Sequence, residues 1–409
     1  LKDGASAVYG ADAVAGVVNI ITRRDYEGFS VEAYTSDFMD MDSGKQDSLN
    51  MIAGKSFDGG NFMFGAEYVD QEEAYQSDAP WKFFQDSWYI YPGGCEKQLT
   101  APYDGTPQGG CYIIGSSRIP ESRLAFTGQG TFMNPGDGLT AYDGRSYNYA
   151  PVNYIQTPYE RTNIFASMNY ELTDDIMLSG DVRYSQRASA QELAPQPYNS
   201  PTDPAYQGVF NGTAYSGISP DNYYLRQAVD AYNLTPAGIA TPLAYEPVRD
   251  ARRRMVETDR RFEQEVDQLQ VVFGASGEFR DMNWDVYYNK GWTDWTSTDY
   301  GQFFGPFLSN AMGPSADLDS NGTPECYGDI NDPSSLIAGC VPMNFFGGPG
   351  ALTSDMIDYV SVVLVDLVEG EQDQYGFSIA GEAFELPGGA MGWAVGYERR
   401  RDTGEFIPD

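Results

Sequence analysis

The side chains best suited to hold a cation lie in one acidic turn. Asp317, Asp319 and Asn321 occupy positions 1, 3 and 5 of Asp-Leu-Asp-Ser-Asn-Gly, and oxygen ligands at that spacing suit calcium. At position 12, where such a loop needs a bidentate Glu, the sequence has Gly328. A plain turn beside Cys326 accounts for the same residues and is the favoured interpretation, because Asp and Asn pair with their own backbone in turns.

Four cysteines form two close pairs, each inside a polar stretch rich in Gly and Pro. Cys95 lies near Cys111, and Cys326 lies near Cys340. In an oxidising compartment this spacing predicts two local disulfides. A zinc site is disfavoured, because the sequence has neither a CxxC pair nor a histidine.

Catalytic chemistry has little support in the sequence. With no histidine, neither a Ser-His-Asp triad nor a HExxH zinc site can form from this chain. Two carboxylates could hydrolyse a glycoside, but 59 Asp and Glu make any particular pair uninformative. We therefore expect no catalytic residue and no cofactor, and a protein that is not an enzyme.

Two further clusters could bind a ligand. Six aromatic residues gather in one polar stretch: Trp81, Phe83, Phe84, Trp88, Tyr89 and Tyr91. They predict either a surface on which a ligand stacks or, as the favoured interpretation, a small core that packs the loop on itself. Five arginines lie at 252–254 and 260–261. Anion binding is one interpretation, and a solvated strand mouth that balances nearby Asp and Glu is preferred.

The overall composition narrows the class of protein. The formal charge of −34 excludes nucleic acid as a partner, since acidic chains repel phosphate backbones. Aromatic residues make up 14% of the chain, which argues against acidic disorder and favours strands. No apolar run approaches the ~20 residues of a membrane helix.

The elements that must position these residues are strands. Apolar and polar residues alternate along 61–70, 176–185, 268–275 and 390–398, so one face is apolar and the other small or polar. Such strands fit a sheet between lipid and a polar lumen, and they fit a soluble sandwich equally well. We count nine strand candidates in the chain.

The connections between these strands separate the two possibilities. Short turns at 58–60, 173–175, 280–283 and 387–390 alternate with long irregular stretches at about 72–157, 188–257 and 298–370. Residues 352–368 lack clean alternation and are expected to form a helix in the third stretch. Soluble domains rarely hold such long loops, whereas outer-membrane barrels carry short turns on one side and long loops on the other.

The beginning of the chain carries a recognisable motif within residues 3–24. Its key positions are Gly4, Ser6, Tyr9, Gly10, Ala13, Gly16, Asn19, Ile20 and Thr22. This pattern closely resembles the end of the plug domain of TonB-dependent outer-membrane receptors. The stretch beginning Cys340-Val-Pro-Met-Asn-Phe-Phe-Gly and the one beginning Gly381-Glu-Ala-Phe resemble large members of the same family.

The resemblance implies an all-β fold: a transmembrane antiparallel β-barrel of about 22 strands around a plug. Residues 1–25 would be the C-terminal end of the plug domain, and 26–409 the N-terminal part of the barrel. Because the sequence starts within the motif, we expect a fragment that lacks most of the plug and the remaining strands. The matched plug residues are expected to be structural, fixing the last plug strands and their join to the barrel.

The function implied by the resemblance is active import of a scarce nutrient across the outer membrane of a Gram-negative bacterium. The ligand would be a siderophore, cobalamin or an oligosaccharide, and the acidic charge slightly favours a neutral glycan. The implied partners are the TonB-ExbB-ExbD energy-coupling complex, outer-membrane lipid and the small ligand. Two alternatives stay open: a passive porin-like channel, and a secreted all-β carbohydrate-active enzyme or adhesin.

Overall fold

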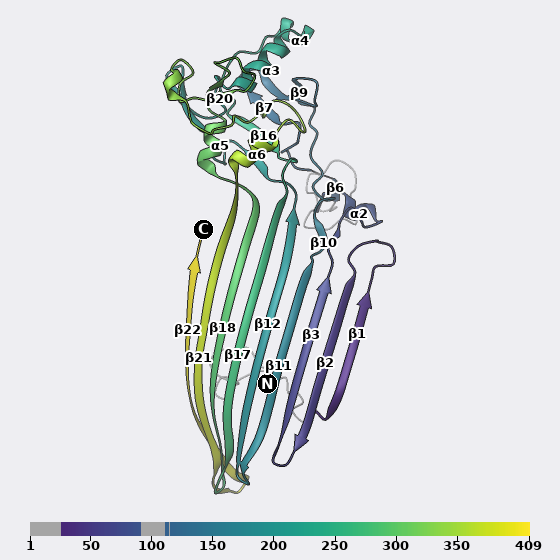
Figure 1. The fold of residues 1–409 in the computed structure, drawn as a ribbon, viewed down its shortest axis with the longest axis vertical. Coiled ribbons are helices and arrows are strands. Elements are labelled where there is room, and N and C mark those ends of the chain that lie inside the picture. Colours follow the sequence, from purple (N-terminus) through teal and green to yellow (C-terminus); the bar gives the residue numbers. More distant parts are fainter. Residues whose placement is uncertain (1–25, 91–110, 114) are drawn as a thin grey trace.

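A tall antiparallel sheet dominates the structure, a computed structural model that describes residues 26–90, 111–113 and 115–409 (Figure 1). Nine strands pair in the order β1-β2-β3-β11-β12-β17-β18-β21-β22. They are β1 (Gly28–Ser36), β2 (Gln46–Phe57), β3 (Gly60–Gln71), β11 (Tyr159–Thr173), β12 (Ile176–Leu193), β17 (Arg260–Phe279), β18 (Met282–Phe303), β21 (Ser361–Leu386) and β22 (Gly389–Ile407). The expected all-β antiparallel fold with nine strands is confirmed.

Four tight turns close the hairpins at the end of the sheet that Figure 1 draws at the bottom. Each turn contains two residues, at 58–59, 174–175, 280–281 and 387–388. Tight hairpins favour a left-handed backbone in the turn, which Gly59 (φ +78°) and Arg280 (φ +57°) adopt. The turn positions predicted from the sequence agree with these hairpins.

The three long connections leave the other end of the sheet and fold together into a cap (Figure 1). We call residues 72–158, 194–259 and 304–360 the first, second and third connections. The first contains β4 (Ala74–Tyr75), α2 (Lys82–Gln85), β5 (Trp88–Ile90), β6 (Cys111–Ile113), β7 (Arg123–Phe126), β8 (Gly130–Met133), β9 (Thr140–Ala141) and β10 (Tyr154–Gln156). The second contains β13 (Pro197–Asn199), β14 (Tyr206–Phe210), β15 (Thr213–Gly217), α3 (Tyr223–Asn233), α4 (Pro236–Ala240) and β16 (Asp250–Arg254). The third contains α5 (Gly305–Ala311), β19 (Ser315–Ala316), β20 (Glu325–Cys326), the 3₁₀ turn η1 (Pro333–Ser335) and α6 (Ser354–Val360).

The cap corrects the expectation that these connections are irregular. Strands of the first and second connections form one five-stranded sheet, ordered β13-β16-β7-β8-β9. The second and third connections are also shorter than expected, because β12, β18 and β21 extend further from the tight turns. The helix expected over 352–368 ends at Val360, and the residues after it belong to β21. Its valine-rich continuation suits a strand, since β-branched side chains favour extended backbone.

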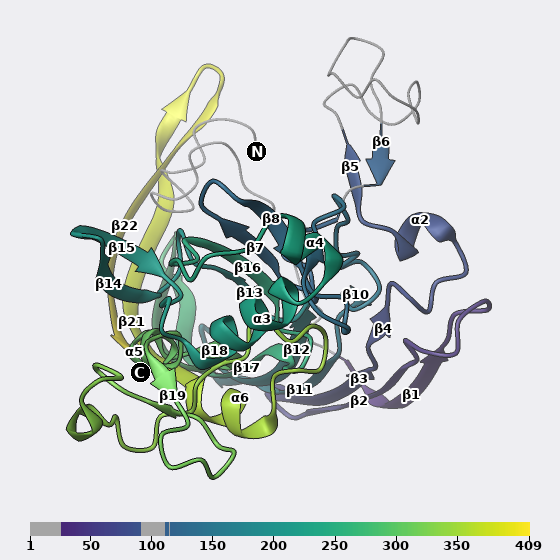
Figure 2. The ribbon, with the colours of Figure 1, turned by 90° about the horizontal axis from the view of Figure 1, so that it is seen from above.

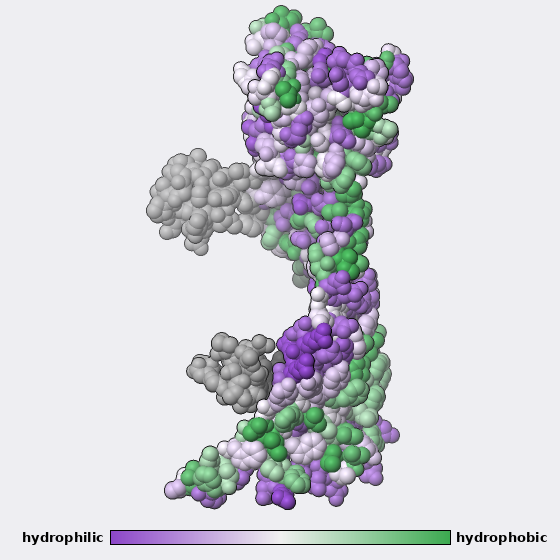
Figure 3. All heavy atoms as spheres, turned by 90° about the vertical axis from the view of Figure 1, so that its left-hand side faces the viewer, coloured by the Kyte–Doolittle hydropathy of each residue, from purple (hydrophilic) through white to green (hydrophobic). Residues whose placement is uncertain are grey.

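A hydrophobic core lies in the cap, where all three connections meet. Leu124 of β7, Val229 of α3 and Phe345 of the third connection belong to one buried cluster. In contrast, many large apolar side chains of the tall sheet are exposed, and hydrophobic residues gather along its outer edge in Figure 3. Seen from above, β7, β16 and α3 lie inside the arc that the tall sheet traces (Figure 2).

Among the described residues, no helix is long and apolar enough to cross a membrane.

Candidate functional site

The concave face of the tall sheet holds a pocket of about 970 Å³. Strands β11, β12, β17, β18, β21 and β22 all contribute to its wall. Its polar lining includes Asn163, Asp181, Arg183, Gln268, Gln270 and Gln372. These side chains alternate along their strands with the apolar residues of the opposite face, so the strand pleat itself builds a polar wall.

A network of amide side chains spans this wall across three strands. Asn289 of β18 accepts a hydrogen bond from Gln270 of β17 (3.1 Å). Asn289 also donates to Gln372 (3.0 Å) and to Gln374 (3.4 Å) of β21. Gln374 in turn donates to the hydroxyl of Tyr287 (3.2 Å). Asn289 itself is buried, and Gln270 and Gln372 are the members of this network that line the pocket. Amides both donate and accept, so these two glutamines present neutral hydrogen-bonding groups to a polar solute.

The same wall carries positive charge near the cap. Arg161 of β11 pairs with Glu67 of β3 (3.1 Å). The ring of Tyr159 lies 6.0 Å from the guanidinium carbon of Arg161 and 5.4 Å from that of Arg187. Within the described part of the chain, Arg183 and Arg187 take part in no ion pair with a carboxylate. This side of the concave face therefore carries three arginines, with Glu67 and Asp181 as the nearby carboxylates.

The opposite, convex face exposes large apolar side chains to the surroundings. Phe29 is 66% exposed, Phe273 is 59% exposed and Val395 is 56% exposed. The apolar band does not follow the rows of paired residues. If each residue is followed to its paired neighbour on the next strand, Tyr68 of β3 leads to Asp267 of β17 and then to Glu369 of β21. The same row is therefore aromatic at β3 and acidic at β17 and β21. The band therefore slopes toward the tight turns from β3 to β22, as expected when strands tilt in a barrel wall.

The first described residue, Tyr26, lines the concave pocket. Its carbonyl oxygen would lie 2.2 Å from a Cβ at Gly54 of β2, so only glycine leaves room for the chain there. The plug-like residues lie outside the described part of the chain. They are Gly4, Ser6, Tyr9, Gly10, Ala13, Gly16, Asn19, Ile20 and Thr22.

Two of the five arginines, Arg253 and Arg254 of β16, are buried in the cap, which corrects the expected solvated strand mouth for them. Arg253 is 0% exposed and Arg254 is 5% exposed. Burial lowers the pKa of Arg254 to about 10, and it also lowers the pKa of Arg253, against the attraction of Glu257. The sequence interpretation failed for these two residues because β16 is a strand inside the cap sheet. Arg261 lies at the rim of the tall sheet in β17, is half exposed and pairs with Glu263 (2.9 Å), which agrees with that interpretation.

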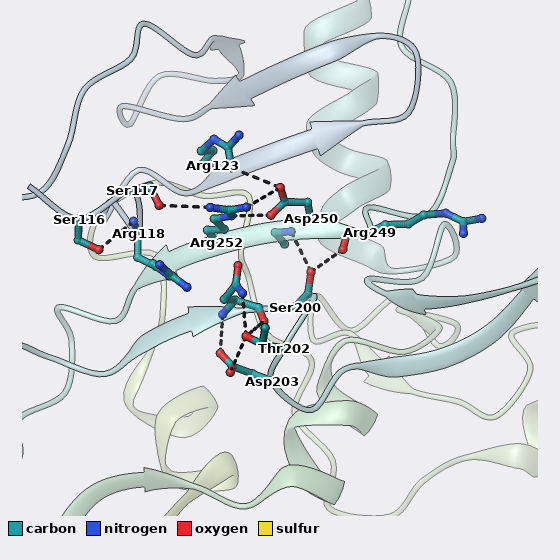
Figure 4. A network of polar contacts seen from close by, with 12 residues as sticks. Ser116, Ser117, Arg118, Arg123, Ser200, Thr202, Asp203, Arg249, Asp250 and Arg252 are labelled. Carbon is teal, nitrogen blue, oxygen red and sulfur yellow. Dashed lines mark hydrogen bonds and ion pairs between the residues drawn. The ribbon is translucent and has the colours of Figure 1, made fainter. Parts of the chain in front are cut away.

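An ion-pair network joins the first and second connections beside these arginines (Figure 4). Asp250 accepts from Arg252 of the same strand (2.6 Å) and from Arg123 of β7 (3.3 Å). Arg252 also donates to Ser117 (3.3 Å). The half-buried carboxylate thus ties two connections together alongside the ladder between β16 and β7.

The aromatic cluster is described only in part. Trp81 is 53% exposed and meets Phe84 edge to face, with ring centroids 6.1 Å apart. Phe84 packs against a small core of Met41, Ala74 and Ala79. That packing agrees with the favoured interpretation of a loop that packs on itself. The indole ring of Trp81 remains exposed to solvent. The side chains of Phe83, Trp88 and Tyr89 and the whole of Tyr91 lie outside the described atoms.

The carboxylate oxygens of the acidic turn accept hydrogen bonds from within the turn itself. Asp317 accepts from the amides of Asn321 (3.0 Å) and Gly322 (2.9 Å). Asp319 accepts from the side-chain amide of Asn321 (2.9 Å). Among the described residues, no three or more His, Cys, Asp or Glu side chains are placed together to hold a metal ion. These contacts are those of an Asp/Asn turn.

One of the two expected disulfides is present. Cys326 and Cys340 are joined in the third connection, with an S–S distance of 2.01 Å and Cα atoms 5.7 Å apart. Cys95 lies outside the described residues, so its expected pairing with Cys111 stays a prediction.

Sequence reasoning missed the amide network and the buried role of Arg253. The network had a signal in the sequence, because Gln268 and Gln270, like Gln372 and Gln374, recur at the two-residue spacing of one strand face. The role of Arg253 had none, because its partners Ser122 and Gly348 lie 131 and 95 positions away along the chain.

Comparison with known proteins gives no sequence relative: neither a family description nor a curated protein matches this chain. Solved structures match at low similarity. They include the siderophore receptor PiuA from Acinetobacter baumannii (9% identity, TM-score 0.33, 99% of this chain and 50% of that one). The ferric-catecholate import receptor Fiu from E. coli K12 (8%, 0.29, 95% and 48%) and the ferric yersiniabactin uptake receptor FyuA from Yersinia pestis (11%, 0.26, 98% and 47%) also match. The chain thus spans about half the length of these structures, all of which are transport receptors.

Proposed function

We propose that this chain forms the end of the plug, part of the barrel wall and the outer cap of a TonB-dependent importer in a Gram-negative outer membrane. The two-faced sheet carries the proposal. Its convex face exposes apolar side chains such as Phe273, whereas its concave face is lined by amides, hydroxyls and charges. A wall with lipid on one side and water or a polar plug on the other needs this division.

The placement of the connections supports an orientation in the membrane. Two-residue turns lie at one end, and the folded cap lies at the other. In outer-membrane barrels the short turns face the periplasm, so the cap would face outward. The position of Tyr26 on the concave side is consistent with residues 1–25 forming the end of a plug inside the wall.

The ligand is proposed to be a scarce polar nutrient of the siderophore, cobalamin or oligosaccharide class. The side-chain amides of Gln268, Gln270 and Gln372, which line the pocket, can exchange hydrogen bonds with hydroxyl, amide or carbonyl groups. Energy would come through the TonB-ExbB-ExbD complex, as the resemblance of the plug motif implies.

Membrane fractionation of the full-length protein, with heat-modifiable migration on a gel, tests the barrel. We expect outer-membrane residence and a shift on heating. A soluble protein that migrates unchanged would favour a secreted enzyme or adhesin. Uptake measured after deletion of TonB then tests energy coupling, and undiminished uptake would indicate a passive channel.

A further inference from the structure

A second, smaller pocket of about 310 Å³ lies in the cap, between the second and third connections. The hairpin of β14 and β15 forms one wall, and Figure 2 shows this hairpin projecting from the side of the cap. The start of α3, the loop before it and residues of the third connection form the other walls. This pocket shares no lining residue with the pocket on the concave face. We call it the cap pocket, and its lining includes Tyr206, Tyr215, Asp221, Arg226, Tyr245 and Asp329.

Tyrosine rings form much of the apolar part of the cap pocket. The rings of Tyr206 of β14 and Tyr215 of β15 have centroids 6.2 Å apart and an interplanar angle of 55°. Gly208 pairs with Tyr215 across the hairpin, and a Cβ at Gly208 would lie 2.7 Å from the Tyr215 ring and 2.8 Å from the Tyr206 ring. The two rings can therefore hold these positions because residue 208 has no side chain. Tyr245 adds a third ring, which is 41% exposed.

Charges of both signs line the cap pocket. Arg226 of α3 pairs with the carboxylate of Asp221. Its guanidinium carbon also lies 5.1 Å from the centroid of the Tyr245 ring. Asp329 of the third connection is exposed, and one of its carboxylate oxygens accepts from the backbone and side-chain amides of Asn331 (2.9 Å and 3.0 Å). The pocket thus contains one ion pair and one further carboxylate.

Two polar groups of the cap pocket are available to a solute. Among the described residues, the second carboxylate oxygen of Asp329 and the hydroxyl of Tyr206 take part in no hydrogen bond. The two groups lie near each other: burial raises the pKa of the Tyr206 hydroxyl, and the carboxylates of Asp221 and Asp329 raise it further. A phenol both donates and accepts, and a carboxylate accepts, so a ligand with several hydroxyl groups can bond to both.

We propose that the cap pocket binds a ring of a neutral sugar. The apolar C–H face of a sugar ring packs on an aromatic ring, and its hydroxyls exchange hydrogen bonds with phenol, carboxylate and guanidinium groups. A cation would meet Arg226, and an anion would meet Asp329 in a chain of net charge −34, so a neutral ligand suits the pocket better than either. The pocket volume lies at the lower end of the range of about 300–1,000 Å³ for small-molecule sites. That size suits a sugar ring better than a ligand as large as cobalamin.

Saturation-transfer NMR on the full-length protein, in a detergent without a sugar headgroup, tests binding. The probes are the methyl glycosides of glucose, galactose, mannose and xylose, with choline as the cationic and N-acetylneuraminic acid as the anionic comparison. At least one neutral glycoside should receive saturation at its ring C–H groups. Tyr245→Ala should weaken its affinity severalfold, because a stacking surface is lost. Phe307→Ala is the matched control, since Phe307 is also 41% exposed but lies outside the cap pocket.

Gly208→Val supplies a second variant, whose added side chain would occupy the space of the two tyrosine rings. It should abolish binding, while the thermal transition of the cap should stay close to that of the unaltered protein, because β14 and β15 form a separate two-stranded sheet. Three results would each overturn the proposal. They are a lack of saturation in all four neutral glycosides, equal affinity in Tyr245→Ala and Phe307→Ala, and tighter binding of choline or N-acetylneuraminic acid.

Uptake by cells tests what the bound sugar is for. That the cap pocket captures an imported oligosaccharide rests on the proposed function, whereas the NMR result does not. A labelled oligosaccharide that contains the bound ring should enter cells carrying Tyr245→Ala severalfold more slowly, at low concentration, than cells carrying Phe307→Ala. Equal uptake alongside weakened binding would mean that the pocket holds sugars of the cell's own surface, which refutes nutrient capture. A protein that does not reside in the outer membrane would instead refute the proposed function and leave the binding result standing.

Discussion

A charge placed on the convex face should reveal whether that face meets lipid. Phe273 of β17 is 59% exposed, and its ring lies over Gly180 of β12. It lies six residues from Phe279 at the tight turn, or ~20 Å along the strand at ~3.4 Å per residue. A strand tilt of ~40° reduces this to a height of ~15 Å, near the middle of an apolar band ~25 Å tall. Phe273→Arg should therefore cost about 2–4 kcal/mol of folding free energy in a bilayer.

The neighbouring residue supplies the matched control. Val272 pairs with Asp181 across the strands and faces the concave side. Val272→Arg should cost below ~1 kcal/mol, since lumen-facing substitutions leave the lipid contact intact. Urea titrations of the full-length protein in lipid vesicles, followed by heat-modifiable migration, measure both values. Equal costs for the two variants, or no cost for Phe273→Arg, would refute a lipid-facing convex surface.

Three further perturbations test other features. Gly54→Val should abolish the folded, heat-modifiable form, because its side chain collides with the Tyr26 carbonyl, whereas Gly392→Ala, which meets nothing within 4 Å, should fold normally. Cys326→Ser opens a disulfide that spans 14 residues and should destabilise the cap by about 3 kcal/mol in thermal unfolding, and an unchanged transition would contradict this. Asp317→Ala should cost about 1 kcal/mol through its lost backbone contacts, and calcium chelation should leave Tm unchanged; a fall in Tm on chelation would instead establish a metal site.

The tall sheet was predictable because its signals are local. Alternation along β12 and β17 identified the strands, and two-residue turns such as the one at Gly59 identified the hairpins. Each signal involves neighbours in sequence, and the antiparallel pairing within each hairpin follows from its short turn. The upper ends of β18 and β21 were missed where apolar and polar residues no longer alternate.

The cap was not predictable for the opposite reason. Its strands are short, and its decisive contacts join distant residues, such as Ser122 with Phe345, 223 positions apart. Rules based on residue type also predict arginines to be exposed, since Arg is almost never fully buried without partners. The sequence shows that an arginine is present at position 253. Its partners become clear only from the fold, which brings the three connections together around it.

The unequal strand lengths have a consequence for how a solute would arrive. The wall rises from nine residues in β1 to 26 residues in β21, and the third connection of the cap hangs from its highest strands. The edge of the described sheet on the cap side is therefore uneven. It is low at β1 and high at β21, where the third connection projects above it. On the proposed function, a solute that reaches the concave pocket from the cap side near β21 would pass beneath the third connection.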